Sequence, residues 1–218
     1  MSQNKVLDYI KRPSILTENA PLLIMLHGYG SDENDLFSFA SELPEQLFII
    51  SVRAPYPIQP YGNAWYAIHF DAPQGKWSDD EQAKTSRDRI AEFINYACEQ
   101  YPVDKKKVTL LGFSQGTILS LATALTYPDR IKNVIGLSGY INEHIIDLQT
   151  SASYKHLNIY TSHGNVDMVI PIQWARQSKP FLNSLGIMNV YEEYAVGHGV
   201  APQNFYSFRD WLSKLINH

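Results

Sequence analysis

Short, continuous apolar segments alternate with longer amphipathic segments along this chain. The apolar runs predict strands buried on both faces, at residues 21–26, 46–52, 107–111, 134–137 and 157–162. Apolar residues at three- and four-residue steps predict helices at 31–43, 79–101, 172–185 and 202–216, and another directly after residue 116. A last strand is expected at 190–194, at a sheet edge, and residues 5–16 should form short edge strands or a loop. In the helix at 79–101, Lys84, Arg87, Glu92 and Glu99 lie off the apolar stripe.

Strands that alternate with helices predict an α/β fold, with a mainly parallel sheet covered by helices on both faces. No linker, repeat or low-complexity segment divides the chain. We therefore expect residues 1–218 to form a single domain.

A strand-to-helix turn in the middle of the chain carries a serine. The strand at 107–111 leads into Gly-Phe-Ser-Gln-Gly at 112–116, and a helix follows. Gly112 and Gly116 remove the side chains that would collide at such a turn, so the Ser114 hydroxyl is exposed at its apex. The N–H groups that begin the helix favour negative charge at the same place. A turn in which the serine only caps the helix is the alternative, but the strand before and the helix after it favour a nucleophile elbow.

Composition narrows the location and the partners. The 218 residues include 44% hydrophobic and 18% charged residues and carry a net charge of −4, which provides no basic surface for nucleic acid. No integral membrane segment is expected, because no run approaches the roughly 20 apolar residues that span a bilayer. The N-terminus lacks the apolar core of a signal peptide, and the single cysteine, Cys98, cannot form an internal disulfide. A cytoplasmic protein is therefore expected.

A long segment between the strand at 46–52 and the helix at 79–101 is rich in proline and aromatic residues and has no regular period. Loops of this length are usually functional or disordered, and the aromatic content argues against disorder. We expect the segment to form a wall of a substrate site, in which Trp65, Tyr66 and His69 contact the substrate. A surface loop folded on its own aromatic residues is the alternative.

Four polar groups follow predicted strands: the His-Gly-Tyr-Gly turn at 27–30, Ser114, Asp167 and His198. The carboxyl ends of parallel strands meet at one edge of a sheet, so we expect these groups to lie close together. A serine hydroxyl needs a base, which a third group orients. His198, between two glycines, is the expected base, and Asp167 is the expected acid. The order serine, aspartate, histidine is the order found in α/β-hydrolases.

The oxyanion of such a reaction needs two N–H donors, and Gln115 and Tyr29 are the expected ones. His27 and His163 each precede a glycine at a strand end, where an imidazole should brace the loop through a backbone hydrogen bond. Cys98 has no cationic neighbour and is expected to be a packed thiol. No group of histidines, cysteines and carboxylates has metal-ligand spacing, so neither a metal nor a cofactor is expected.

Several motifs resemble the phospholipase/carboxylesterase family, which includes acyl-protein thioesterases. They are the segments at 26–32, 53–55, 65–66, 112–116, 137–140, 163–171 and 197–198. The resemblance runs from about residue 22 to residue 215. It implies an α/β-hydrolase fold without a large cap domain, a catalytic triad of Ser114, Asp167 and His198, and backbone donors at Tyr29 and Gln115. Arg53 and Ala67 depart from the family's usual pattern.

These features predict a serine carboxylesterase that hydrolyses small- or medium-chain carboxylic esters through an acyl-enzyme on Ser114. An acyl-protein thioesterase or a lysophospholipase would use the same triad and differ only in the acyl groove. A catalytically silent binding protein of the same fold is a further alternative, although such a protein would commonly have lost one triad residue. The expected partner is a small-molecule ester or thioester. The oligomeric state stays open, with a homodimer among the alternatives.

Overall fold

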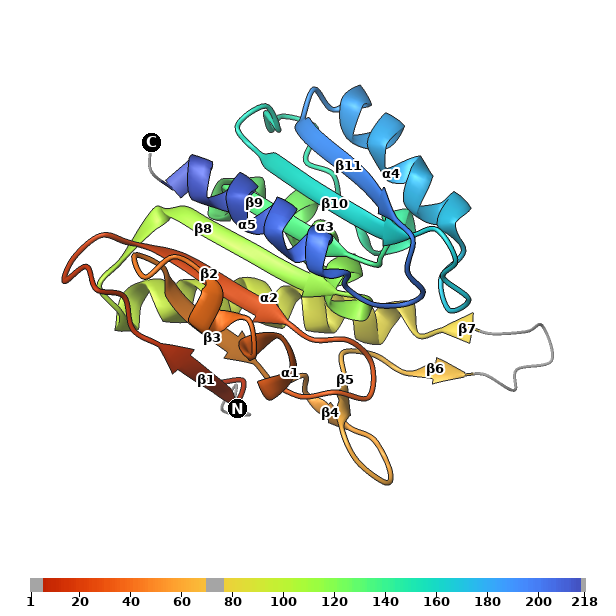
Figure 1. Ribbon diagram of the computed structural model, residues 1–218, viewed down its shortest axis with the longest axis horizontal. Coiled ribbons are helices and arrows are strands. Elements are labelled where there is room, and N and C mark those ends of the chain that lie inside the picture. The colour runs from red at the N-terminus through yellow and green to blue at the C-terminus, as the bar shows by residue number, and fades with distance from the viewer. Residues whose placement is uncertain (1–5, 70–76, 217–218) are drawn as a thin grey trace.

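A seven-stranded sheet forms the centre of the molecule (Figure 1). The computed structural model describes residues 6–69 and 77–216. The strand order is β1-β3-β2-β8-β9-β10-β11. The strands are β1 (Tyr9–Arg12), β2 (Ala20–Leu26), β3 (Phe48–Val52), β8 (Val103–Phe113), β9 (Asn133–Leu137), β10 (Asn158–Gly164) and β11 (Met188–Tyr194). Only β1, at one edge, runs antiparallel to its neighbour, and the other pairs are parallel. The prediction of a mainly parallel sheet is confirmed.

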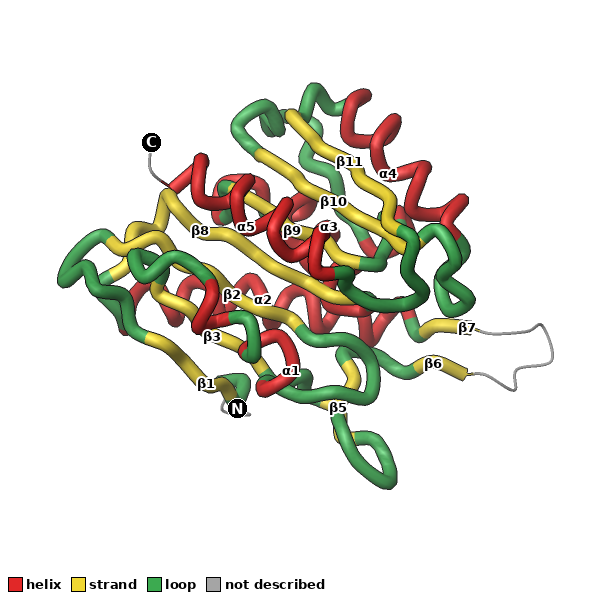
Figure 2. The backbone as a smooth tube through the Cα atoms, in the orientation of Figure 1, coloured by secondary structure: helices red, strands yellow, loops and turns green. Residues whose placement is uncertain are grey.

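Helices cover both faces of this sheet (Figure 2). They are α1 (Asn34–Phe37), α2 (Asp80–Gln100), α3 (Gln115–Thr126), α4 (Ile172–Ser184) and α5 (Pro202–Ile216), with 3₁₀ turns η1 (Ala40–Glu42), η2 (Pro128–Arg130) and η3 (Glu143–Ile145). Successive side chains of a strand point to opposite faces. In β2, Leu22 and Ile24 therefore pack in the cluster that includes α2 and α3, whereas Leu23 and Met25 pack with α1 and α5. Within the described ranges, no helix has the length and apolar character to cross a bilayer.

The helix predicted at 31–43 is wrong in its length. The chain forms only α1 and η1 there, and Leu43 has an extended backbone with ψ 154°. Arg12, from the edge strand β1, donates hydrogen bonds to the carbonyl oxygens of Ala40, Leu43, Pro44 and Leu47. These carbonyls are therefore satisfied by a distant guanidinium and do not need a continuous helix.

The segment between β3 and α2 is more regular than its sequence pattern indicates. It contains two small antiparallel pairs: β4 (Tyr56–Pro57) with β5 (Asn63–Ala64), and β6 (Ile68–His69) with β7 (Trp77–Ser78). Residues 70–76, which also belong to this predicted wall, lie outside the described residues.

The loops that carry the candidate residues gather at one end of the sheet. The connection from β10 to α4 and the connection from β11 to α5 reach the same end in Figure 2. β2 and β8, which are parallel neighbours, also end there, with Leu26 opposite Gly112. This arrangement is the expected consequence of parallel pairing.

Candidate active site

Ser114 lies in a strained turn between β8 and α3. Its φ of 54° and ψ of −115° are rare for a residue with a side chain. A Cβ atom on Gly116 would lie 1.8 Å from the carbonyl oxygen of Leu26, and one on Gly112 would lie 2.3 Å from the backbone of Gly116. The turn thus requires both glycines. Its place in the sheet is fixed by the Ser114 N–H, which donates to the carbonyl oxygen of Leu137 at 2.9 Å.

Asp167 lies in the loop after β10, and its side chain is buried. One carboxylate oxygen, Oδ1, accepts the N–H groups of Val169 at 2.8 Å and Ile170 at 3.0 Å. The other, Oδ2, lies 2.7 Å from Nδ1 of His198. Burial alone would raise the pKa of Asp167, but the N–H donors of Ile170, His198 and Val169 outweigh it and lower the pKa. Asp167 is therefore an oriented carboxylate anion near neutral pH.

His198 lies in the loop between β11 and α5. This loop approaches β10 closely, since a Cβ atom on Gly164 would lie 2.2 Å from the carbonyl oxygens of Val196 and Gly197. Because Nδ1 of His198 donates its hydrogen to Asp167, Nε2 of the neutral ring is an acceptor. Nε2 lies 3.0 Å from Oγ of Ser114, whose hydroxyl can donate to it. Ser114, His198 and Asp167, which come from three separate loops, thus form one chain of hydrogen bonds.

A cavity of about 810 Å³ opens above Ser114 and His198. Tyr66 and Ile68, which follow β5, form one part of its wall, and residues 140–144, which follow β9, form another. The ring centroids of Tyr140 and of Trp174, which is part of α4, lie 5.0 Å apart. The volume lies in the range of small-molecule sites, and the aromatic and aliphatic lining suits an apolar group of a substrate.

The two predicted oxyanion donors, Tyr29 and Gln115, also line this cavity. Gln115 is the first residue of α3, so its N–H has no acceptor within the helix. The turn that carries Tyr29 is braced by His27, as expected: Nδ1 lies 2.7 Å from the carbonyl oxygen of Gly28, and Nε2 accepts the Ala54 N–H at 3.0 Å. Burial lowers the pKa of His27, which keeps the ring neutral and able to make both bonds.

Trp65 does not line the cavity, contrary to the prediction. Its side chain is completely buried, and its indole N–H donates to the carbonyl oxygen of His27 at 2.9 Å. The large apolar ring is more stable in the core, where its polar N–H also finds an acceptor. Among the three predicted substrate contacts, the described lining includes Tyr66 but neither Trp65 nor His69. His69 is exposed at the end of β6.

The side chain of Gln115 has a role that the sequence did not predict. Its Oε1 accepts the Trp65 N–H at 3.0 Å, and its Nε2 donates to the carbonyl oxygen of Tyr66 at 2.9 Å. The residue after the nucleophile therefore fixes the wall that carries Tyr66. A buried amide in the first turn of an apolar helix is a signal that could have indicated this contact.

The remaining candidate groups have structural contacts. His163 lies 3.0 Å from the carbonyl oxygen of Ile170 through Nε2, which also lies 3.3 Å from Oδ2 of Asp167, so this ring braces the loop as expected. Cys98 packs against the core, and burial raises the pKa of its thiol. Over residues 6–69 and 77–216, no group of three or more histidines, cysteines and carboxylates could hold a metal ion.

Comparison with known proteins places this chain in a family. The model of one family, Phospholipase/Carboxylesterase, matches residues 14–216. The chain belongs to the phospholipase/carboxylesterase family. As a member, it is a hydrolase that acts on esters or thioesters.

Relatives in the phospholipase/carboxylesterase family include acyl-protein thioesterase 1 of Kluyveromyces lactis, which is 26% identical over 211 residues, covering 89% of this chain and 92% of the relative. Acyl-protein thioesterase 1 homolog 1 of Dictyostelium discoideum is 28% identical over 216 residues, covering 92% and 93%.

Two solved structures show the same α/β-hydrolase fold. The carboxylesterase of Bacillus cereus has a TM-score of 0.82 at 19% identity, covering 97% of this chain and 95% of its own. Acyl-protein thioesterase 2 of Zea mays has a TM-score of 0.75 at 20% identity, covering 96% and 99%. No separate cap domain is present in the part of the chain that the structure describes.

Proposed function

We propose that this protein is a serine carboxylesterase that hydrolyses small- or medium-chain carboxylic esters through an acyl-enzyme on Ser114. The observation that carries this proposal is the chain of hydrogen bonds from Oγ of Ser114 through His198 to Asp167, at 3.0 and 2.7 Å, at the base of the 810 Å³ cavity. A hydroxyl, a neutral imidazole and a buried carboxylate in this order form an activated nucleophile.

In the proposed reaction, Oγ of Ser114 attacks the ester carbonyl carbon while Nε2 of His198 takes the hydroxyl proton. The carbonyl electrons move onto the oxygen, which the N–H groups of Tyr29 and Gln115 stabilise. When the carbonyl re-forms, the bond to the alcohol oxygen breaks and His198 protonates the departing alcohol. Water, deprotonated by His198, then attacks the acyl carbonyl carbon. The bond from this carbon to Oγ of Ser114 breaks, His198 returns the proton to Oγ, and the acid is released. Asp167 stabilises the imidazolium in both halves of the reaction.

The lining of the cavity supports an apolar substrate group. Tyr66, Ile68, Tyr140 and Trp174 provide apolar surface near Ser114. Each methylene group that such a surface removes from water contributes about 0.8 kcal/mol. Esters with a short or medium acyl chain should therefore be preferred over acetate esters, up to the length that fills the cavity.

The names of the relatives favour a second candidate, acyl-protein thioesterase. A thioester carbonyl reacts with the same nucleophile, base and oxyanion donors, and only the leaving group differs. Lysophospholipase activity would use the same groups as well. These activities are separated by comparing an oxygen ester, a thioester of the same acyl group and a lysophospholipid.

The test of the proposed function is covalent labelling with a fluorophosphonate, combined with p-nitrophenyl ester hydrolysis. We expect the wild type to be labelled on Ser114, and Ser114→Ala to lose labelling and about 10³-fold or more of kcat/KM, because the residues of a triad act as a unit. Ser213→Ala is the matched control, since Ser213 lies on α5 and donates its hydroxyl hydrogen to the carbonyl oxygen of Arg209, away from the cavity lining. A wild type that is neither labelled nor active would overturn the proposal in favour of a silent binding protein.

A further inference from the structure

Two neighbouring residues of α2 contact two segments that adjoin the lining of the cavity. Ser86 donates its hydroxyl hydrogen to the carbonyl oxygen of Trp65, which precedes Tyr66 in one wall. Arg87 donates from Nη1 to the carbonyl oxygen of Ile145 at 2.8 Å, directly after the lining residues 140–144 of the other wall. Both side chains are buried. One short stretch of α2 therefore holds both segments.

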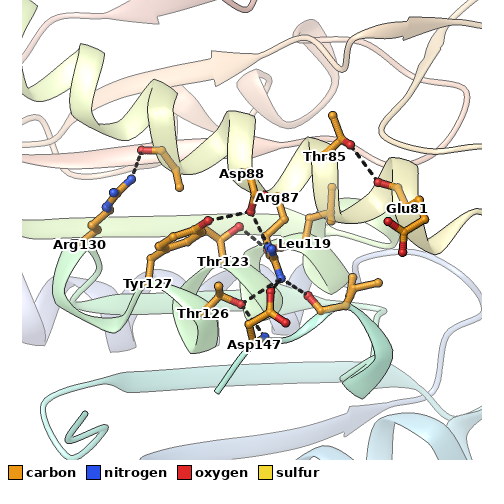
Figure 3. Close-up of polar contacts among 12 residues, drawn as sticks. Glu81, Thr85, Arg87, Asp88, Leu119, Thr123, Thr126, Tyr127, Arg130 and Asp147 are labelled. Atoms are coloured by element: carbon orange, nitrogen blue, oxygen red, sulfur yellow. Dashed lines mark hydrogen bonds and ion pairs between the residues drawn. The ribbon is translucent and has the colours of Figure 1, made fainter. Parts of the chain in front are cut away.

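Arg87 bonds two residues of the segment 140–147, Ile145 and Asp147, as well as Asp88 and Thr126 (Figure 3). Its Nη1 lies 2.7 Å from the carboxylate of Asp147, and its Nε lies 2.7 Å from Oδ1 of Asp88 on its own helix. The backbone N–H of Asp147 also donates to Oγ1 of Thr126 at 3.2 Å. Asp147 is thus fixed through its backbone by α3 and through its carboxylate by α2.

Charge keeps this contact intact at neutral pH. Burial disfavours the charged form of Arg87, but the carboxylates of Asp88 and Asp147 outweigh this effect, and the pKa of the guanidinium is raised. Without this partner, the buried carbonyl of Ile145 would need another donor, and the exposed carboxylate of Asp147 would be free to turn to water. Removing the guanidinium should therefore let residues 140–147 move away from α2.

A second contact on α2 fixes the same wall nearer to the cavity. The side-chain amide of Asn142 donates to Oδ1 of Asp80 at 3.3 Å, and its own oxygen accepts the His144 N–H at 3.1 Å. In the part of the wall that carries Tyr66, Oε1 of Gln82 accepts the Ala67 N–H at 3.0 Å. Both walls thus rest on the first two turns of α2.

We propose that Arg87 is a positioning residue for substrate selection, which fixes the wall at residues 140–147 and thereby sets the width of the cavity above Ser114. The proposal rests on the proposed esterase function, but it concerns the acyl group that is accepted and not the chemical step. Arg87 is not among the described residues that line the cavity, so it acts through the wall. An acyl group long enough to touch this wall depends on Arg87, whereas an acetyl group does not.

The test compares p-nitrophenyl acetate and p-nitrophenyl hexanoate as substrates of Arg87→Ala. We expect the ratio of kcat/KM for hexanoate over acetate to fall about four- to fifteenfold, the effect of losing one or two methylene contacts, through a higher KM for hexanoate. The kcat for acetate should stay within about threefold of the wild type. Arg87→Lys keeps the charge but not the forked geometry and should give an intermediate ratio.

Arg130→Ala is the matched control. Arg130 donates to the carbonyl oxygen of Ala91 at 2.9 Å and lies over the ring of Tyr127, so it also joins α2 to its neighbours but contacts no wall residue (Figure 3). It should lower Tm and leave the ratio unchanged. Asp147→Ala removes the partner on the wall, and since this carboxylate is 63% exposed, the variant should fold even if Arg87→Ala does not.

Three results are decisive. A lower ratio in a folded Arg87→Ala, with an unchanged ratio in Arg130→Ala, supports the positioning role, and an unchanged ratio in a folded Arg87→Ala overturns it. Where Arg87→Ala does not fold, the ratio of Asp147→Ala decides in the same way. A wild type without esterase activity overturns the proposed function itself and the positioning role with it, and this is established before any variant is compared.

Discussion

The strongest single perturbation of the candidate active site is Asp167→Asn, because the structure dictates how the new amide must lie. The backbone N–H groups of Val169 and Ile170 both point at Oδ1 of Asp167. The amide oxygen, the only acceptor of an asparagine side chain, must therefore occupy that position. The NH₂ group then takes the place of Oδ2, where it faces Nδ1 of His198 at 2.7 Å and Nε2 of His163 at 3.3 Å.

Two donors cannot share a hydrogen bond, so His198 must change its tautomer. Nδ1 then accepts from the amide, and the remaining hydrogen moves to Nε2, 3.0 Å from Oγ of Ser114. The ring can no longer accept the serine proton. A tautomer trapped in this way lowers kcat by about 10⁴-fold in a serine protease triad. We expect a loss of similar size here, which corresponds to about 5.4 kcal/mol at 1.36 kcal/mol for each factor of ten.

The assay is steady-state hydrolysis of a p-nitrophenyl ester by Asp167→Asn, with thermal unfolding as a check of the fold. KM should change by no more than a few fold, since Asp167 does not line the cavity. Asp210→Asn is the control, because Asp210 lies at the surface of α5, where it pairs with Arg209. A loss below about tenfold in a folded Asp167→Asn variant would refute the orientation argument, since it would mean that His198 keeps an acceptor facing Ser114.

Two further predictions concern groups away from the reacting atoms. Trp65→Phe should lower the free energy of unfolding by about 1–3 kcal/mol, because side-chain volume is lost and the carbonyl of His27 loses its donor. The ratio of hexanoate to acetate hydrolysis should stay unchanged, and a changed ratio would mean that Trp65 contacts the substrate. Glu192 accepts hydroxyl hydrogens from Tyr160, Tyr194 and Ser207; burial alone would raise its pKa, but these bonds lower it. Its stabilisation is complete above the ordinary glutamate pKa of about 4.3 and is lost as pH falls through the lower pKa of the folded state. Urea unfolding should therefore show Glu192→Gln to be about 1–2 kcal/mol less stable than the wild type at pH 7, with the difference shrinking below pH 4, and a difference independent of pH would contradict this role.

The order of strands and helices could be predicted from the sequence because each buried strand is a continuous apolar run and each long helix has an apolar stripe. Pro202–Ile216 was predicted to be helical and forms α5 with these bounds. The prediction of a continuous helix at 31–43 was wrong, although the apolar spacing of a helix is present there. The donors that replace helical hydrogen bonds come from Arg12, about 30 residues away in the sequence. A pattern within one segment carries no information about such a partner.

In the candidate site, too, some residues could be placed from the sequence and others could not. Ser114, Asp167 and His198 each follow a strand of a parallel sheet, and topology alone brings such positions together. The orientation of an aromatic side chain in an irregular segment has no comparable rule. Trp65 and Tyr66 are adjacent, yet the first ring lies in the core and the second lines the cavity, because Gln115 fixes the backbone at both residues.

Arg87 shows why the support of the cavity could not be predicted. The sequence-based interpretation set Arg87 apart from the apolar stripe, with Lys84, because it is charged. By helical spacing it lies three residues before Ile90 and seven before Ile94, so it shares their buried face. Its side chain is only 5% exposed, because residues 140–147 cover it and supply a carbonyl and a carboxylate as partners. A charge at such depth is stable only when it is paired, so the wall must be in place whenever α2 is packed against the sheet. The shape of the cavity is therefore coupled to the packing of the core, and variants that loosen α2 near Arg87 should change substrate selection before they unfold the protein.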